Sequence, residues 1–359
     1  MDLTEALGRG TWVDDTYVVD TCPICTGNYT FRYRKSGLWE CVDCKNRGFE
    51  NDLVSVVTDL FVKRNLQNLD KPKPPDGLVV VSEYRKPKHD KVILTGFNKL
   101  DRLLGGLVSG QLTVLTGKRS HGKSTFGGQM ALNAVNEDKP VCFYSGELCS
   151  GMFQNWLMLQ AAGERYLNGY VDVTGAERWQ VDAYAERRIK EWLGLKMILY
   201  DNTIVKSSER NTILERFAKA HDYYGCELFF VDNLMTARYA IDSDRDYYRA
   251  QSNFVGQLVD FAMERNVHVV LVAHPRKGDS GDINEDVGGS SDITNRASNV
   301  VQITRLSEEK ALEMGYGSVA TIAKNRNYGD IGKIALNFEK GSKRFVCSGM
   351  VDRYGWEDL

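Results

Sequence analysis

The sequence predicts an α/β protein with a mostly parallel central sheet, preceded by a small cysteine-rich module. From Ile93 onward, strand-like and helix-like segments alternate, which is the pattern of parallel α/β sheets. Near the N-terminus, four of the eight cysteines form two Cys-x-x-Cys pairs. We therefore expect three parts: a cysteine module over 1–50, a connector over 51–92 and an α/β domain over 93–359.

The composition is that of an ordinary soluble globular protein, with 42% hydrophobic and 26% charged residues. No apolar run approaches the roughly 20 residues that span a bilayer, and the acidic start is unlike a signal peptide. The other four cysteines lie scattered in apolar segments, which favours a reducing compartment. We expect the cytoplasm of a bacterial or phage-infected cell, or an organelle matrix, and neither secretion nor a membrane. The net charge of −2 leaves DNA open as a partner, because basic groups can be concentrated locally.

The first module has the spacing of a zinc ribbon. Two Cys-x-x-Cys pairs at this separation can place four thiolates tetrahedrally around Zn²⁺. The ligands would be Cys22, Cys25, Cys41 and Cys44. A module this small buries too little apolar surface to fold alone, so the metal would supply much of its folding free energy.

A hairpin is predicted between the two cysteine pairs, where aromatic residues alternate with cations. Phe31, Tyr33 and Trp39 either stack on single-stranded nucleic acid or pack a core of the hairpin's own, and the sequence leaves both open. After the module, the spacing of apolar residues predicts a helix over 52–69. A basic linker that holds four of the seven prolines follows it.

The stretch from Gly117 to Ser124, Gly-Lys-Arg-Ser-His-Gly-Lys-Ser, has the pattern of a phosphate-binding P-loop. It joins a predicted strand over 111–116 to a predicted helix over 124–136, as such a loop requires. In this pattern Lys123 reaches the β- and γ-phosphates, and the Ser124 hydroxyl ligates Mg²⁺. The nucleotide, ATP or another NTP or dNTP, is expected to contact Gly117, Ser120, His121, Gly122, Lys123, Ser124 and Thr125.

Chemistry in parallel α/β folds collects where the strands end. The predicted strands are 111–116, 141–145, 197–200, 228–231, 268–273, 300–303, 319–323 and 333–338. Asp232 is expected to hold a Mg²⁺-bound water, Glu147 to act as general base, and His274 to bond the γ-phosphate. Taken as an isolated residue, Glu147 is more typical of an acid at a helix N-terminus, and His274 of a hydrogen-bonded buried histidine. Lys324 and Arg326 follow another strand, and Arg326 suits an arginine finger.

Together these motifs resemble the RecA-type motor of ring-forming replicative helicases, the family of Twinkle, the phage primase-helicases and, more distantly, DnaB. The resemblance covers 93–350 and rests on 94–107, 117–124, 144–148, 273–277 and 323–326. It implies a homo-hexamer with ATP between subunits, in which Lys324 and Arg326 act on the neighbour's nucleotide. It also implies 5′→3′ translocation on single-stranded DNA, unwinding of forked duplex, and DNA contacts from Arg238, Arg276 and Lys277. Primase, polymerase and single-strand-binding protein are the partners that it implies.

The cysteine module resembles the zinc-binding domain of bacterial and phage primases, through the segments 22–25 and 38–48. The primase catalytic (TOPRIM) domain does not fit within the connector, so primer synthesis is not expected. Asn295 departs from the glutamine that many relatives carry at that place. Two other functions stay open: a RadA-like recombination or branch-migration ATPase, and a regulatory ATPase ring that does not unwind DNA.

Overall fold

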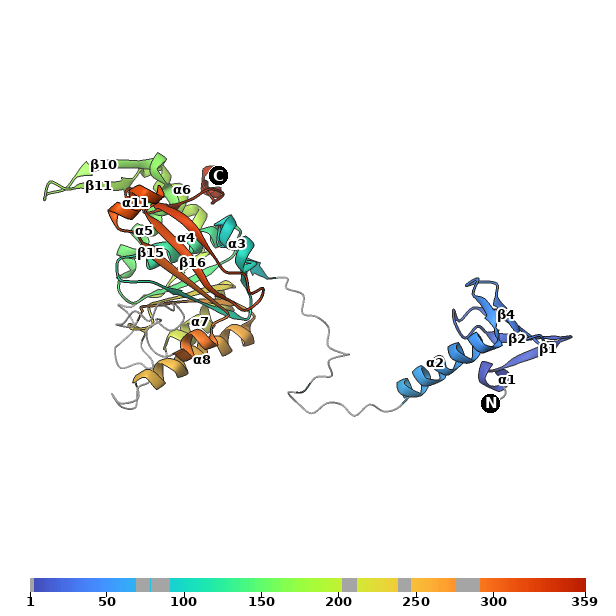
Figure 1. The fold of residues 1–359 in the computed structure, drawn as a ribbon. Helices are drawn as coiled ribbons and strands as arrows, with labels where there is room; N and C mark the ends of the chain where they lie inside the picture. The colour runs from blue at the N-terminus through green and yellow to red at the C-terminus, as the bar shows by residue number, and fades with distance from the viewer. Residues whose placement is uncertain (1–2, 69–77, 79–90, 202–211, 238–246, 276–290) are drawn as a thin grey trace. The chain divides into compact units, whose positions relative to one another are not determined.

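The computed structural model describes residues 3–68, 78, 91–201, 212–237, 247–275 and 291–359 (Figure 1). The chain forms two compact units, Met1–Pro87 and Lys88–Leu359. Within the described ranges, every helix is too short or too polar to cross a bilayer.

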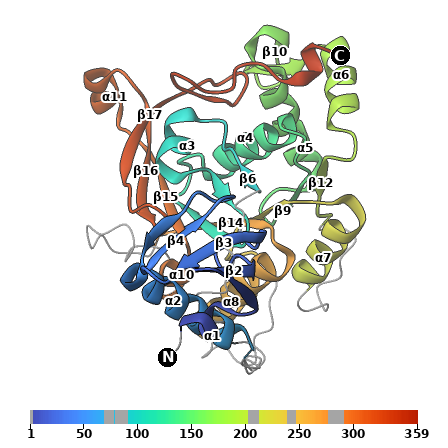
Figure 2. The same cartoon turned by 90° about the vertical axis from the view of Figure 1, so that its right-hand side faces the viewer.

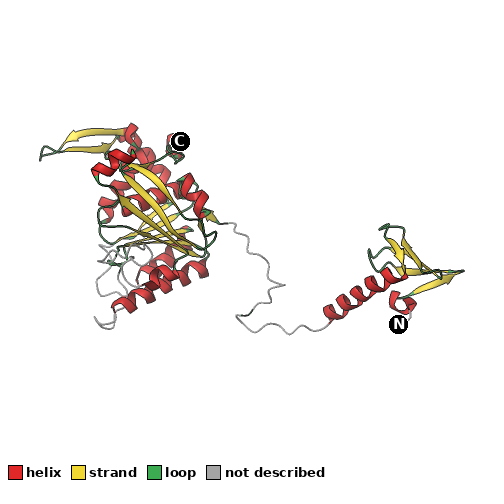
Figure 3. Cartoon of the chain, viewed as in Figure 1, coloured by secondary structure: helices red, strands yellow, loops and turns green. Residues whose placement is uncertain are grey.

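The N-terminal unit is a five-stranded antiparallel sheet with two helices (Figure 3). The strands pair in chain order: β1 (Gly10–Val13), β2 (Thr16–Thr21), β3 (Asn28–Arg34), β4 (Leu38–Cys41) and β5 (Arg47–Phe49). The helices are α1 (Leu3–Leu7) and α2 (Glu50–Asn68). Strands β3 and β4 are the predicted hairpin, with Tyr33 opposite Trp39.

The aromatic residues of this hairpin form the core of the N-terminal unit. Phe31, Tyr33 and Trp39 are 0%, 9% and 4% exposed, and the rings of Phe31 and Trp39 stack 5.5 Å apart. Leu53 and Val57 of α2 join the same core, so this helix packs on the sheet. Successive side chains on a strand point to opposite faces, which turns the aromatic residues inward and the intervening cations outward. The core-packing interpretation is therefore confirmed, and the nucleic-acid stacking interpretation is wrong for these three residues.

The second unit is built on a nine-stranded sheet with the order β12-β9-β13-β14-β8-β15-β16-β17-β18. Every pairing from β12 to β15 is parallel, and the pairings from β15 to β18 are antiparallel. The strands are β8 (Gln111–Thr116), β9 (Val141–Ser145), β12 (Met197–Leu199), β13 (Leu228–Asp232), β14 (His268–Ala273), β15 (Asn299–Arg305), β16 (Ser318–Asn325), β17 (Gly332–Phe338) and β18 (Phe345–Val346). All eight predicted strands are present, and the mostly parallel sheet is confirmed.

Helices cover both faces of this sheet, as Figures 1 and 2 show from two directions. One face packs against α3 (Asn98–Leu104), α4 (Lys123–Asn136), α5 (Ser150–Ala162) and α6 (Ala183–Leu193). The other packs against α7 (Thr212–Tyr224), α8 (Tyr247–Arg265) and α10 (Ser291–Arg296). Strand β13 belongs to both cores: Phe230 enters the first and Phe229 the second. A strand buried on both faces reads as a continuous apolar run, which is why Leu228 to Val231 has no polar residue.

Several short elements lie outside the predicted pattern. They are the hairpin β10 (Leu167–Val171) and β11 (Glu177–Val181), the pair β6 (Val92–Ile93) and β7 (Leu107–Val108), the helix α11 (Glu308–Met314), and two 3₁₀ turns, Glu164–Tyr166 and Gly355–Glu357. In Figure 1 the β10–β11 hairpin extends from the upper left of the second unit.

A buried histidine ties strand β14 to its surroundings. His268 is 0% exposed; its Nδ1 lies 2.7 Å from the carbonyl oxygen of Val108, and its Nε2 lies 3.0 Å from the Thr113 hydroxyl. The carbonyl fixes Nδ1 as the donor and leaves Nε2 to accept from the hydroxyl. Burial lowers the pKa of His268 to about 4, because the protonated ring would be desolvated.

We predict that His268 makes the stability of this unit depend on acid pH. Between pH 6.5 and about 4 the unfolded chain binds a proton that the folded chain excludes, so the free energy of unfolding falls as pH falls. The loss is on the order of 3 kcal/mol. Urea unfolding across this range measures it, and His268→Gln is expected to remove this component while the partly exposed His221→Gln keeps it. An equal pH dependence in both variants would contradict the assignment.

Candidate functional site

The P-loop lies between the end of β8 and the start of α4, and neighbouring elements explain its two glycines. Gly117 has φ 147°, and a Cβ there would lie 2.2 Å from the carbonyl oxygen of Ile303 in β15. Gly122 has φ 89°, and a Cβ there would lie 2.5 Å from the ring of Phe345. Any other residue would push the loop away from the sheet.

Lys123 folds back into the loop. Its Nζ donates to the carbonyl oxygens of Gly117 at 2.8 Å and Lys118 at 3.0 Å, and the residue is 5% exposed. Burial lowers the pKa of Lys123, while the carboxylates of Asp232 and Glu147 act in the opposite direction. The ammonium thus stands at the centre of the loop, where a β- or γ-phosphate oxygen would lie.

Asp232 ends strand β13 and is 2% exposed. Burial raises the pKa of Asp232 to about 6, in opposition to a hydrogen bond from the Ser124 side chain. A carboxylate beside a hydroxyl supplies the oxygen ligands that Mg²⁺ prefers, so the donor set fits the ion. A cation there would also offset the cost of burying the carboxylate.

Asn233 connects the two remaining polar residues of the site. Its Nδ2 lies 2.5 Å from Oε1 of Glu147 and 3.1 Å from Nε2 of His274. Its Oδ1 accepts from the backbone N–H groups of Met235 and Thr236, so the amide cannot rotate without losing these two hydrogen bonds. Burial lowers the pKa of His274, and its buried Nδ1 has no hydrogen-bond partner among the described residues. Asn233 was not identified as a site residue from the sequence. The one signal that could have found it is its position directly after Asp232.

These residues surround a cavity of about 990 Å³. It brings together Ser120, His121, Gly122, Lys123, Ser124, Thr125, Glu147, Asp232 and His274, all of which the sequence assigned to one site. Gly117, the first residue of the loop, is not among the residues that line the cavity, and its carbonyl oxygen accepts from Lys123. The cavity is also lined by residues that the sequence analysis did not assign to the site: Arg119, Trp156, Asn233, Arg305, Gly317, Ser318, Asn337, Phe338, Lys340, Lys343 and Phe345.

Lys324 and Arg326 lie at the other end of the sheet. Strand β16 is antiparallel to β15, and Lys324 pairs with Val300, near the start of β15, whereas the P-loop follows the far end of β8. The Nζ of Lys324 donates to the carbonyl oxygen of Thr294 at 2.6 Å, and Nη2 of Arg326 to that of Asn295 at 2.5 Å. The cations therefore lie away from the P-loop of their own chain, because the strand that carries them is reversed.

The predicted DNA contacts, Arg238, Arg276 and Lys277, lie outside the described residues. Asn295 is exposed in the last turn of α10, and its carbonyl oxygen accepts from Lys324 at 3.3 Å as well as from Arg326.

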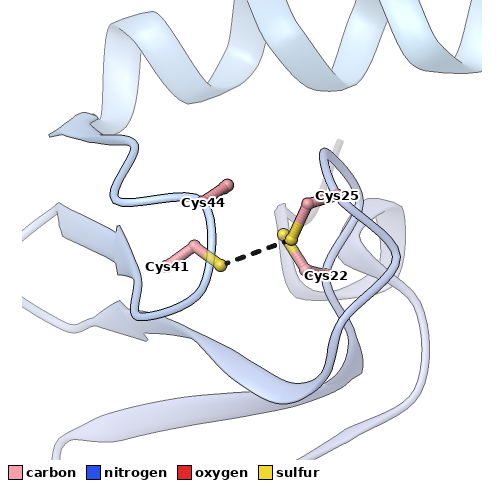
Figure 4. Close-up of side chains that lie close together, drawn as sticks. All are labelled: Cys22, Cys25, Cys41 and Cys44. Atoms are coloured by element: carbon pink, nitrogen blue, oxygen red, sulfur yellow. Dashed lines mark hydrogen bonds between the residues drawn. The ribbon is translucent and has the colours of Figure 1, made fainter.

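The N-terminal unit gathers its four cysteines, Cys22, Cys25, Cys41 and Cys44, on two facing turns (Figure 4). All four Sγ atoms lie within 4.8 Å of one another, and those of Cys25 and Cys41 are 3.7 Å apart. Four sulfurs at about 2.3 Å from one Zn²⁺ would be about 3.8 Å apart, so the spacing fits this ion. Backbone and side-chain N–H groups already face the sulfurs: Ile24 N donates to Cys22 Sγ and Asn46 Nδ2 to Cys44 Sγ.

Two thiols of this cluster, Cys22 and Cys41, have pKa values that are shifted in opposite directions. Burial raises the pKa of Cys22 to about 12. At Cys41 burial acts in the same direction, but hydrogen bonds from Cys44 and Thr30 outweigh it and lower the pKa to about 6. Neighbouring thiolates repel one another unless a cation lies between them, so a dication would favour ionisation of the whole set.

A family model and two curated relatives point to one family. A family model described as the DnaB-like helicase C-terminal domain matches residues 92–347. The replicative DNA helicase DnaB of Treponema pallidum is 26% identical over 282 residues, covering 75% of this chain and 59% of that protein. The corresponding protein of Haemophilus influenzae is 25% identical over 266 residues, covering 70% and 54%. The chain thus spans less than two thirds of the length of these curated relatives.

Two solved structures share the fold. One, described as an ATPase domain, matches with a TM-score of 0.57 at 17% identity, covering 80% of this chain and 96% of that one. A DnaB-like replicative helicase, described with its interactions with primase, also matches with a TM-score of 0.57, at 18% identity, covering 82% and 72%. The RecA-like ATPase fold is therefore confirmed. Since the family model matches well over half of the 359 residues, the chain belongs to the DnaB-like replicative helicase family.

Proposed function

We propose that this protein is an ATP-dependent replicative DNA helicase, a hexameric ring that moves 5′→3′ on single-stranded DNA and unwinds forked duplex. Membership of the DnaB-like family supports the activity. One observation supports the proposed ring assembly: the P-loop cavity and the Lys324–Arg326 pair lie at opposite ends of one sheet. Two half-sites on opposite edges of a subunit suit a head-to-tail contact that closes into a ring.

Within one subunit, the proposed steps follow from the contacts of the cavity. The P-loop N–H groups and Lys123 bind the β- and γ-phosphates, and Ser124 and Asp232 would hold Mg²⁺. Bound there, the ion would neutralise charge on the phosphate oxygens. Glu147, 52% exposed, is open to the water that attacks the γ-phosphate and accepts its proton.

Asn233 positions this base. Its amide bridges Glu147 and His274, so the carboxylate and the imidazole share one fixed partner. Loss of the γ-phosphate would change what His274 bonds, and the bridge passes that change to Glu147 and to the segment after Asp232. We propose that this segment and the one after Pro275, with Arg238, Arg276 and Lys277, bind the DNA strand.

The neighbouring subunit completes the chemistry in this proposal. Lys324 and Arg326 would approach the γ-phosphate of the adjacent subunit and stabilise the charge of the transition state. Burial, followed by the nearby Arg326, lowers the pKa of Lys324, as expected for two cations in a crowded site. An anion brought by a neighbour would relieve this repulsion.

We further propose that the cysteine cluster binds one Zn²⁺ and that 1–50 form a zinc ribbon joined by a connector over 51–92 to the motor over 93–359. The distances between the four sulfurs support this. Primase, polymerase and single-strand-binding protein are the proposed partners, in the cytoplasm of a bacterial or phage-infected cell or in an organelle matrix.

Replacement of Lys123 tests the function. Lys123→Ala is expected to lower ATP hydrolysis by at least about 100-fold and to abolish unwinding, because it removes the cation that binds the phosphates. Unwinding of a fluorescent fork with a 5′ single-stranded tail, compared with a 3′ tail, measures activity and polarity together. Lys118→Ala, whose exposed side chain lies in the same loop outside the cavity, is the control. Strand exchange without unwinding would indicate a RadA-like ATPase, and ATP hydrolysis without either activity a regulatory ring.

A mixing experiment tests the shared site. Arg326→Ala alone is expected to lower hydrolysis on the order of 10³-fold. Mixed in equal amounts with Lys123→Ala, it should recover activity, because about a quarter of the interfaces would then join an intact P-loop to an intact arginine. The chain with both substitutions, mixed with either single variant, supplies the control and should recover nothing. Inactive mixtures whose rings have the wild-type size would contradict the arrangement.

Metal analysis tests the ribbon. We predict about one Zn²⁺ per chain, lost together with the fold of the N-terminal unit in the double variant Cys22→Ser, Cys41→Ser, since the metal supplies folding free energy. Cys149→Ser, at an exposed cysteine outside the cluster, should keep the metal. Metal-free protein with an intact N-terminal unit would refute the assignment.

A further inference from the structure

The turn between β17 and β18 brings two lysines to the cavity at a place that the P-loop motif does not include. Lys340 and Lys343 both line the cavity. Each ammonium lies over an indole ring, Lys343 at 5.1 Å from the ring centre of Trp156 and Lys340 at 5.7 Å from that of Trp179. Trp156 also lines the cavity, so the Lys343–Trp156 pair belongs to its wall.

This turn is fixed to the P-loop helix by buried hydrogen bonds. The Nε2 of Gln160 donates to the carbonyl oxygen of Thr125 at 2.8 Å and to that of Lys343 at 3.0 Å. Arg344, 4% exposed, donates from Nε to the carbonyl oxygen of Gln160 at 2.5 Å and from Nη2 to that of Ala161 at 3.0 Å. Lys343 therefore keeps a set position relative to Thr125, one residue after the proposed Mg²⁺ ligand.

The backbone at Lys343 is unusual for a lysine. Its φ is 56°, in the left-handed region that asparagine and glycine tolerate better. Such strain persists where the surrounding structure enforces it, and it clusters at ligand sites. Here the two hydrogen bonds that flank the residue, through Gln160 and Arg344, hold the turn in this conformation.

The charge of Lys343 lacks a compensating acid. Burial lowers the pKa of Lys343, and the neighbouring charge that acts on it is another cation, Arg178. No carboxylate within the described part of the chain forms an ion pair with it. A half-buried ammonium beside a second cation is stabilised by an anion, and a nucleoside triphosphate in this cavity carries several negative charges.

We propose that Lys343, held over Trp156 and anchored through Gln160, is a further nucleotide-binding residue that contacts a phosphate oxygen of the bound nucleoside triphosphate from the β17–β18 turn. The inference rests on the nucleotide site proposed above and adds a cation that comes from outside the P-loop. Lys340, which is exposed, contributes less, since solvent screens its charge.

Two substitutions separate charge from packing. Lys343→Asn removes the charge and suits the left-handed backbone, so the fold should be kept or slightly stabilised. Lys343→Arg keeps the charge. We expect the dissociation constant for Mg²⁺-ATP, measured by calorimetry with a non-hydrolysed analogue, to rise about tenfold in Lys343→Asn and less than about threefold in Lys343→Arg. The difference should shrink as salt is raised, because it is a contribution of charge.

Controls keep this test apart from the test of the site itself. Lys333→Asn removes an exposed lysine of β17 that does not line the cavity and should bind like the wild type. If the wild-type chain fails to bind ATP, the proposed function itself is contradicted. If it binds ATP and Lys343→Asn binds equally well at low salt, the role of Lys343 is overturned.

Discussion

A single buried amide fixes the architecture around the P-loop cavity. Gln129 of α4, 0% exposed, accepts from the backbone N–H of Phe345 and donates to its carbonyl oxygen, both at 2.9 Å. This pairing holds β18 beneath the P-loop helix, and the ring of Phe345 in turn fills the space beside Gly122. The antiparallel end of the sheet thereby becomes a wall of the cavity, and a buried amide left unpaired would cost more than the hydrogen bonds it makes.

The buried charges of the cavity lower the stability of the folded chain. Burial raises the pKa of Asp232 and lowers that of Lys123, so each group is held where its charged form is disfavoured. A hydrogen bond from Ser124 offsets part of this cost at Asp232. A ligand that brings both phosphate and a divalent cation would relieve the rest, and binding to the folded state alone raises its stability. Occupancy of the cavity and stability of the unit are therefore linked.

The sequence predicted the parts of this molecule that follow local rules. The eight strands and the P-loop have regular spacing or fixed glycines, and Asp232 directly follows an apolar strand. It could not show the direction of β16, because strand periodicity is the same in both directions. Trp156 and Lys343 lie far apart in the chain, and long-range packing alone brings them together. At the N-terminus, alternation predicted the hairpin, whereas the burial of Phe31 depended on α2, which packs on the same core.

The reversal of β16 has a consequence for how energy would be used. The strand carries Arg326 to the end of the sheet opposite the P-loop. A free subunit therefore holds both halves of the proposed chemistry, but its own arginine cannot reach its own P-loop. Hydrolysis per subunit would then rise with protein concentration instead of staying constant, and an open assembly would leave one cavity idle at one end. Under this arrangement an unassembled chain hydrolyses little nucleotide, and turnover per subunit reports how far the chains have assembled.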